Sequence, residues 1–137
     1  MDPGYSVSTD KALLNIPLIH EYLCNHSYWA KGRTPEQVKI SIENSMCFGV
    51  YRGKEQVGFA RVITDKSTFA YLADVFILET HRGKGLSKSL MDEILRHPEL
   101  QSLRRFMLAT RDAHALYEKF GFKNITRPER WMEIFNE

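Results

Sequence analysis

A basic turn with two glycines, near the middle of the chain, is the first place where residue types suggest chemistry. Residues 82–87 read RGKGLS; they follow an apolar run over 72–78 and open a segment with Leu86, Leu90 and Ile94 four apart. This order predicts a strand, a glycine-rich loop and a helix. Glycine lets the backbone approach a ligand, and the first helical N–H groups lack partners and attract anions. The turn therefore predicts a site for a phosphate-bearing small molecule.

Two common phosphate loops do not match this turn. A P-loop has wider glycine spacing and Ser or Thr after its Lys, and the dinucleotide fingerprint has a third glycine where Lys88 stands. The turn instead resembles Arg/Gln-x-x-Gly-x-Gly/Ala, the pyrophosphate loop of the GNAT (Gcn5-related) N-acetyltransferases. Arg82 fills the first position and Gly85 the central one, while Ser87 departs from the last but keeps a small side chain.

A second segment strengthens the resemblance. Residues 113–122 read AHALYEKFGF, which is similar to the Ala-x-x-x-Tyr-Glu-Lys-x-Gly-Phe segment near the end of GNAT enzymes. Its apolar residues share one face of a short helix, and Gly121 suits the position just past the helix end. The two motifs occur in the family's order, and the resemblance covers at least residues 46–135.

The resemblance implies an acyltransferase that moves an acetyl group from acetyl-CoA, as cosubstrate, to a primary amine. Pantetheine is expected in a split between the 69–78 strand and the 105–109 strand. There it would bond the backbone near Phe76 and Ile77, whose side chains are expected in the core. Backbone N–H groups are expected to hold the pyrophosphate at Arg82, Gly83, Lys84, Gly85, Leu86 and Ser87.

Tyr117, inside the second motif, is the expected catalytic residue. Amine attack on the thioester expels a thiolate whose conjugate acid has a pKa near ~8.5 if it resembles Cys. A phenol with a pKa of about 10 is protonated at neutral pH and can act as the general acid. At Thr110, seven residues earlier, the family often has an Asn that bonds the cofactor. The Thr110 hydroxyl could supply part of that bonding to the cofactor.

The general base is not identified by the sequence. Tyr71 and Ala73 occupy the strand positions where some family members carry a Glu or His base. Alternation predicts that Asp74 faces the other side of the sheet unless a bulge intervenes, and we expect it to be buried and bonded to loops. The remaining candidates are Glu21, His26, Glu79, ordered water, or capture of an already neutral amine.

The acceptor is expected to contact the N-terminal third. Residues 26–32 form a polar, aromatic loop in which Tyr28 and Trp29 either stack on an amine or cover the sheet edge. The closing segment over 128–133 either lines the same cavity or contacts a second subunit, which leaves a homodimer open.

These motifs require a sheet to carry them. Helices are predicted over 16–25, 35–44, 85–96 and 113–120, and Thr34, Pro35 and Gln37 form a capping box with proline in the first turn. The fold class is α/β: a mixed, mainly antiparallel sheet with helices on both faces and a CoA-binding split between two central strands. Strands are predicted over 5–8, 46–51, 56–64, 69–78 and 105–109, and near Phe122 and Trp131–Phe135.

Composition bounds the partners. The 137 residues suit a single domain over 1–137, with 43% hydrophobic and 26% charged residues. A net charge of +2 gives little reason to expect nucleic acid or membrane. Cys24, Cys47 and the five histidines show no metal-ligand spacing. Without a signal-like start or an apolar run near ~20 residues, a cytoplasmic location is expected.

Three functions compete. The first is a CoA-dependent N-acetyltransferase acting on a small molecule or peptide. The second is a non-catalytic acyl-CoA sensor of the same fold, which the absence of a carboxylate at Tyr71 favours and Tyr117 disfavours. The third is a nucleic-acid or phosphopeptide module built on Arg82, Lys84, Lys88, Arg104 and Arg105, which the near-neutral charge disfavours.

Overall fold

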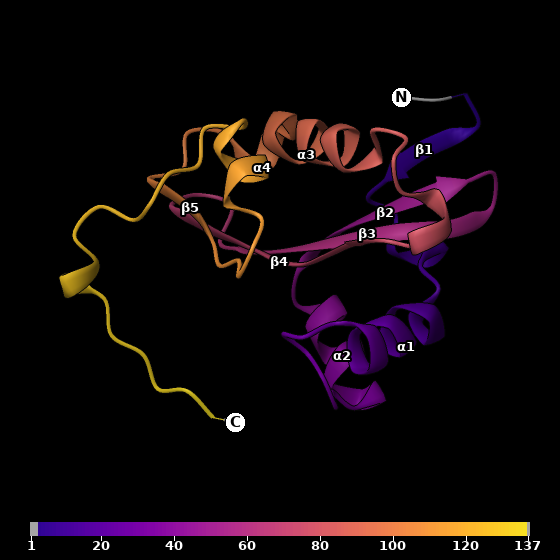
Figure 1. Ribbon diagram of the computed structural model, residues 1–137, viewed down its shortest axis with the longest axis horizontal. Coiled ribbons are helices and arrows are strands. Elements are labelled where there is room, and N and C mark those ends of the chain that lie inside the picture. The colour runs from indigo at the N-terminus through magenta and orange to yellow at the C-terminus, as the bar shows by residue number, and fades with distance from the viewer. Residues whose placement is uncertain (1–2, 137) are drawn as a thin grey trace.

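The computed structural model describes residues 3–136, and a five-stranded sheet lies at its centre (Figure 1). The strands follow one another across the sheet in chain order. Neighbours pair antiparallel except for the last two, which pair in parallel. From one edge to the other the strands are β1 (Tyr5–Ser8), β2 (Met46–Arg52), β3 (Glu55–Thr64), β4 (Phe69–Ile77) and β5 (Arg105–Leu108).

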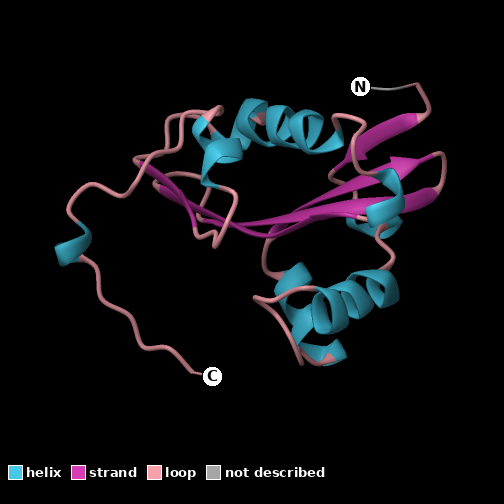
Figure 2. Cartoon of the chain, in the orientation of Figure 1, coloured by secondary structure: helices cyan, strands magenta, loops and turns pink. Residues whose placement is uncertain are grey.

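Helices cover both faces of this sheet (Figure 2). The described residues form α1 (Ile16–His26), α2 (Pro35–Glu43), α3 (Leu86–Arg96) and α4 (His114–Glu118). Helices α1 and α2 lie together under one face, and α3 and α4 lie over the other. This confirms the mixed α/β sheet with helices on both faces that the sequence predicts. None of these helices is both long and apolar enough to span a membrane.

Local sequence signals set the start of α2. The Thr34 side chain accepts the Gln37 backbone N–H at 3.1 Å, and the Gln37 side chain accepts the Thr34 N–H at 2.9 Å. Pro35 occupies the first helical position, where a missing N–H costs nothing. The capping box expected from the sequence is therefore confirmed, and it fixes where the preceding loop must end.

Each face of the sheet has its own apolar core. Strands β2 and β3 are buried on both faces, so they belong to both cores. The core under α3 consists of Phe48, Val50, Val57, Ala60, Val62, Ala70, Leu72, Ile77, Leu86, Leu90, Met91, Ile94 and Leu100. The core under α1 and α2 consists of Ile19, Leu23, Ala30, Val38, Ile42, Cys47, Phe59 and Phe76.

Two predicted strands do not form. Neither the residues after Phe122 nor Trp131–Phe135 join a ladder, and the closing residues run away from the sheet as an open segment (Figure 1). An apolar pattern tells which residues need burial, but a strand forms only when its N–H and C=O groups meet a neighbour's. A partner strand for Trp131–Phe135 would have to come from a distant segment of the chain. The local apolar pattern carries no information about that partner.

The two cysteines differ in burial. Cys47 lies in the core beneath α2, and burial raises the pKa of its thiol to about 11. Cys24, on α1, is partly exposed. The thiolate is the reactive form.

We therefore predict that a disulfide reagent at pH 8 labels one thiol per native chain quickly and the second only after denaturation. In Cys24→Ser no fast thiol should remain; two fast thiols in the native chain would contradict the buried position.

Candidate active site

Strands β4 and β5 pair over only part of their length. The parallel register joins Phe69–Leu72 to Arg105–Leu108, and β4 then continues from Ala73 to Ile77. Beyond Leu108 the chain turns toward α4, so among the described residues the last part of β4 has no strand partner on this side. Strands β4 and β5 therefore separate where the sequence analysis placed the split, although β5 is an edge strand of the described sheet rather than a central one.

A β-bulge in β4 begins where the pairing with β5 stops. Phe59 pairs with Phe76 and Arg61 with Ala73, so one strand advances two residues while β4 advances three. Asp74 stands in the bulge with φ 54°, a left-handed conformation that few non-glycine residues adopt. Strict alternation would send Asp74 to the α3 face, and the bulge turns it to the α1–α2 face instead.

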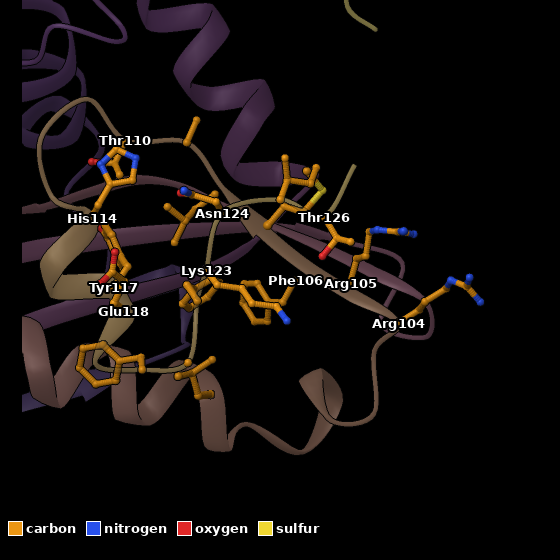
Figure 3. A pocket seen from close by; sticks show the side chains of 18 residues that line it. Arg104, Arg105, Phe106, Thr110, His114, Tyr117, Glu118, Lys123, Asn124 and Thr126 are labelled. Carbon is orange, nitrogen blue, oxygen red and sulfur yellow. The ribbon is translucent and has the colours of Figure 1, made fainter. Parts of the chain in front are cut away.

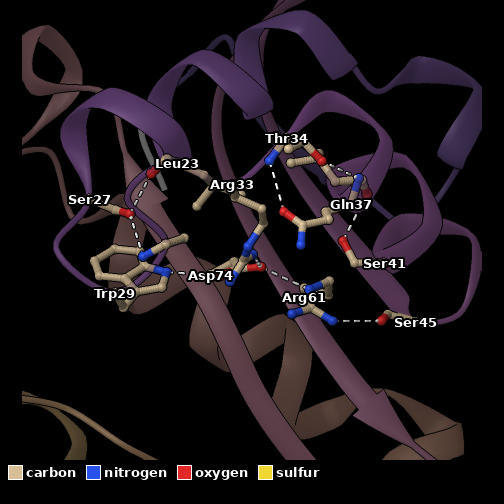
Figure 4. Close-up of polar contacts among 12 residues, drawn as sticks. Leu23, Ser27, Trp29, Arg33, Thr34, Gln37, Ser41, Ser45, Arg61 and Asp74 are labelled. Atoms are coloured by element: carbon tan, nitrogen blue, oxygen red, sulfur yellow. Dashed lines mark hydrogen bonds and ion pairs between the residues drawn. The ribbon is translucent and has the colours of Figure 1, made fainter. Parts of the chain in front are cut away.

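The Asp74 carboxylate is the centre of a buried polar network (Figure 4). Its side chain is 2% exposed. Oδ1 accepts the Trp29 indole N–H at 2.8 Å, while Oδ2 accepts Nη1 of Arg33 at 2.8 Å and Nε of Arg61 at 2.9 Å. These contacts confirm that Asp74 is buried and bonded to loop residues. Both oxygens are thus engaged by three donors, an arrangement typical of a structural counter-charge.

The loop over residues 26–32 crosses from β4 to the segment after β5. Trp29 reaches Asp74 on β4, while the Tyr28 hydroxyl accepts the backbone N–H of Arg111 at 3.0 Å. The Arg111 guanidinium also lies over the Tyr28 ring, 3.9 Å from its centroid. This loop therefore covers the end of the split. Arg111 occupies one face of Tyr28, and both aromatic side chains stay partly exposed, so contact with an amine remains a prediction for this pair.

The other base candidates lie in less suitable places. Glu21 and His26 bond each other at 2.9 Å on the exposed side of α1. Glu79 is exposed, in a short turn just before the glycine-rich loop. Tyr71 and Ala73 supply no carboxylate or imidazole. Across residues 3–136, no three His, Cys, Asp or Glu side chains gather as a metal ion would require.

The glycine-rich loop presents unpartnered backbone N–H groups at the start of α3. Gly83 and Gly85 have φ 79° and 74°, and the space where a Cβ would stand is open at both. The first backbone bond that enters the helix runs from the Ser89 N–H to the Gly85 carbonyl, and no side chain caps the helix. No acceptor within the described chain bonds the N–H groups of residues 83–88. Such a cradle suits an anion.

Arg82 has a different role from the rest of this loop. Its backbone N–H donates to the Glu79 carbonyl at 3.2 Å, so this group is occupied within its own turn. Its guanidinium donates to the Ile77 carbonyl at 2.9 Å and to the Tyr22 hydroxyl at 3.0 Å. The Tyr22 ring stacks on Phe76 with centroids 4.0 Å apart. Arg82 thus ties the loop to the end of β4 and to α1.

Tyr117 lines a cavity of about 890 Å³ beside β5 (Figure 3). Burial, with a smaller contribution from Tyr28, raises the pKa of the Tyr117 phenol above its usual value. Thr110 and His114 line the same cavity. The Thr110 hydroxyl accepts the Ala113 N–H at 3.1 Å, so Thr110 helps to start α4 in the place where an Asn was expected. Gly121, with φ 97°, ends that turn as expected.

Sequence reasoning missed three arginines. Arg61 interrupts an otherwise apolar run in β3, and that interruption is a signal for a buried counter-charge. Arg33 and Arg111 stand in polar loops, where an arginine carries no comparable signal. Their contacts with Asp74 and Tyr28 arise only when distant segments come together.

The comparisons with known proteins identify the family. Residues 16–122 match the family described as "Acetyltransferase (GNAT) family". "Putative acetyltransferase FG08082" of Gibberella zeae is 36% identical over 143 residues, which cover 88% of this chain and 80% of that protein. "Uncharacterized N-acetyltransferase ycf52" of Gracilaria tenuistipitata var. liui is 32% identical, with 80% of this chain and 62% of that protein covered.

Solved structures share the fold. A crystal structure from Xanthomonas campestris pv. campestris, a "putative acetyltransferase belonging to the gnat family", has a TM-score of 0.97 and 50% identity, covering 99% of this chain and 96% of the other. A GNAT family acetyltransferase from Elizabethkingia anophelis with acetyl-CoA bound has a TM-score of 0.66 and 13% identity, covering 89% and 78%. The second likeness concerns the fold alone.

The Asp74 network predicts a specific loss of stability. Asp74→Asn leaves the buried Arg61 guanidinium and the partly exposed Arg33 guanidinium without their counter-charge. Breaking a buried ion pair typically costs about 3–5 kcal/mol. We expect the free energy of unfolding, measured in urea, to fall by about that amount. The control is Asp112→Asn, whose contact with Arg111 is exposed and 3.8 Å long and should change stability by less than about 1 kcal/mol. An unchanged stability together with a large loss of activity would instead identify Asp74 as a base.

Proposed function

The chain belongs to the GNAT acetyltransferase family, and we propose that it moves an acetyl group from acetyl-CoA to a primary amine of a small molecule or peptide. The reaction is a direct attack in a ternary complex, carried by one N-acetyltransferase domain over residues 1–137 without a metal. The proposal places the protein in the cytoplasm and assigns it neither a nucleic-acid nor a membrane partner. The observation that carries the proposal is the cradle of N–H groups at the start of α3.

That cradle fits the pyrophosphate of acetyl-CoA. The N–H groups of Gly83, Lys84, Gly85, Leu86 and Ser87 are proposed to bind its oxygens, and the helix dipole and the Lys84 ammonium favour the negative charge. The Arg82 side chain would hold the loop against β4 rather than touch phosphate, because its donors are already bonded to Ile77 and Tyr22. Leu86, which is buried in the core, fixes the loop from below.

The unpaired edge of β4 fits the pantetheine arm. An extended chain with amide groups can add to a free strand edge through backbone hydrogen bonds. Phe76 and Ile77 are the proposed contacts, used through their backbone alone because their side chains belong to the two cores. The Ile77 carbonyl is already bonded to Arg82, so any bond to pantetheine there would use its N–H or share the carbonyl.

In the chemical step the neutral amine attacks the thioester carbonyl. A C–N bond forms, the C–S bond breaks with its electron pair going to sulfur, and the nitrogen loses a proton. Tyr117 is proposed to donate its phenolic proton to the departing thiolate. The raised pKa of Tyr117 keeps the phenol protonated at neutral pH, so the acid is available in every turnover.

Deprotonation of the amine is assigned to ordered water or to capture of the neutral form. The pKa of an alkyl ammonium is about 10.4, so a small neutral fraction exists at pH 7. Asp74 is committed to Arg33 and Arg61, and Glu21, His26 and Glu79 lie on exposed surfaces. The acceptor is proposed to enter beneath the loop of residues 26–32, beside Tyr28 and Trp29.

A second candidate function rests on the same missing base. A sensor would bind acyl-CoA through the same cradle and release it unchanged. The occupied Asp74 and the absence of a carboxylate at Tyr71 favour this alternative. A half-buried phenol at Tyr117, in the cavity next to β5, favours the enzyme, because binding alone needs no acid. The two candidates share the ligand and differ in turnover.

The cradle is tested by calorimetric titration with acetyl-CoA. In Gly85→Glu the new carboxylate stands at the anion site and the backbone keeps a left-handed φ that costs about 1–2 kcal/mol. We expect affinity to fall by at least about tenfold and CoA lacking its 3′,5′-ADP portion to bind weakly. Gly53→Glu is the matched control, because Gly53 also has a positive φ (60°) and open space but lies in a distant hairpin turn. Absence of binding by the unmodified protein would refute both the enzyme and the sensor.

The general acid is tested by Tyr117→Phe. Loss of the phenol should lower kcat by roughly 10²–10⁴-fold while leaving acetyl-CoA affinity nearly unchanged. The acid must carry its proton, so kcat should fall as pH rises through the Tyr117 pKa. Because that pKa is raised, the fall should begin above the usual value of about 10 and should vanish in the variant.

Tyr51→Phe is the control for this substitution. The Tyr51 hydroxyl is buried without a hydrogen-bond partner among the described residues, so its removal should leave both kcat and the alkaline fall unchanged. An alkaline fall that persists in Tyr117→Phe would assign it to another group.

A further inference from the structure

An arginine is stacked on an aromatic ring of the loop over residues 26–32. The Arg111 guanidinium lies 3.9 Å from the centroid of the Tyr28 ring, whereas the two other contacts of this kind in the described chain measure 5.1 and 5.7 Å. The Tyr28 hydroxyl in turn accepts the Arg111 backbone N–H at 3.0 Å. Two contacts between the same pair of residues therefore hold this guanidinium in place, although Arg111 is exposed.

The N–H donors of this guanidinium are free of hydrogen bonds within residues 3–136. Stacking uses the flat face of the group, while its five donors point outward from the edge. Among the described residues its acidic partner is Asp112, whose Oδ2 lies 3.8 Å from Nη2 of Arg111, too far for a hydrogen bond. Both side chains are mostly exposed, so this ion pair contributes little. An oriented guanidinium with free donors suits an anion.

Arg111 lies on the side of the split from which the acceptor is proposed to enter. The Tyr28 phenol is near enough to Tyr117, the proposed general acid, to help raise the pKa of Tyr117. Trp29, next to Tyr28, reaches Asp74, close to where β4 loses its partner β5. The cradle proposed for the pyrophosphate follows the end of β4, at the other end of the unpaired edge. This position suits a contact with the acceptor rather than with the cofactor.

The charges on this side of the split are mainly positive. Asp74 is the only buried carboxylate among the described residues, and Arg33 and Arg61 share it. One negative charge between two guanidinium groups leaves positive charge in excess before Arg111 is counted. The Arg33 side chain is 23% exposed, so part of this excess reaches the surface. An anionic group that enters here gains from the resulting field, while an amine without such a group does not.

We propose that the acceptor is a small primary amine that also carries an anionic group, a carboxylate or a phosphate, and that Arg111 binds this group. The planar guanidinium offers two parallel N–H donors, which match two oxygens of either anion. With the anion held at Arg111, the amine end of the same molecule is directed into the split toward the thioester. This acceptor class deepens the proposed acetyl transfer and rests on it. Arg111 then sets which amine is used, while Tyr117 serves as the acid.

The first test compares matched pairs of amines at saturating acetyl-CoA. The carboxylate arm sets γ-aminobutyrate and β-alanine against their amides, and the phosphate arm sets O-phosphoethanolamine against ethanolamine. We expect kcat/KM to be roughly 10–100-fold higher for the anionic member in at least one arm, which is the size of one charge-assisted hydrogen-bonded pair. The arm that shows the preference identifies the anion. Neutral members that are acetylated equally well or better in both arms overturn the proposal.

Arg111→Met tests whether this residue carries the preference. The hydrogen bond to Tyr28 uses the Arg111 backbone, so the substitution keeps it. KM for the anionic amine should rise roughly 10–100-fold with kcat nearly unchanged, because the lost contact serves binding. The neutral partner and the affinity for acetyl-CoA should be unaffected. Arg111→Lys keeps the charge without the planar fork and should give an intermediate KM.

Arg52→Met is the matched control for this substitution. Arg52 also lies over a tyrosine ring, at 5.7 Å, but it stands on β2 toward the opposite edge of the sheet. Its loss should leave the preference for the anionic amine unchanged. A preference that persists in Arg111→Met, or that disappears equally in Arg52→Met, overturns the proposal.

Binding of the same amines separates a failure of the anion site from a failure of acetyl transfer. The NMR signal of the Arg111 Nε–H group is assigned by its absence in Arg111→Met and is followed as each amine is added to the CoA complex. A saturable shift with an anionic amine, but not with its neutral partner, supports the anion site. If no amine is acetylated despite such a shift, the transfer reaction is what fails. No shift with any anionic amine overturns the anion site, whether or not neutral amines are acetylated.

Discussion

The buried carboxylate of Asp74 is the interaction on which the arrangement of the candidate site depends. One side chain holds the Trp29 indole and the Arg33 guanidinium, which come from the loop between α1 and α2, and the Arg61 guanidinium, which comes from β3. A charge this deeply buried is tolerated only when partners surround it. The segments that carry those partners are therefore held in one arrangement, and the loop over the split is among them.

The same bulge explains why the split exists. Pairing between β4 and β5 ends at Leu72, and the extra residue of β4 lies between Ala73 and Phe76. A bulge bends its strand, and β5 pairs with β4 only up to Leu72, next to the bulge. One inserted residue thus turns a carboxylate toward the α1–α2 face and leaves a free strand edge on the β5 side. The Arg82 clamp on Ile77 then sets the glycine-rich loop at the far end of that edge.

At its other side β5 leaves the sheet unfinished. A parallel pair on one edge and an open gap on the other give β5 only half of the backbone partners that a central strand has. The aromatic residues next to β5 are only half-buried, and the apolar residues at the C-terminus are exposed. Apolar area left in water on both surfaces is a driving force for association.

What the sequence determined by itself was local. The glycine-rich turn, the capping box at Thr34 and Gln37, the turn at Gly121 and the order of helices and strands depend on neighbouring residues, and they appear as expected. Only the tertiary structure decided what pairs across the chain. It gave Asp74 its arginines, bonded the Arg82 side chain to the Ile77 carbonyl, and left Trp131–Phe135 without a ladder. The physical reason is that a periodic pattern reports which residues need burial or a partner. The identity of that partner depends on segments tens of residues away, and a single bulge can reverse which face a side chain takes.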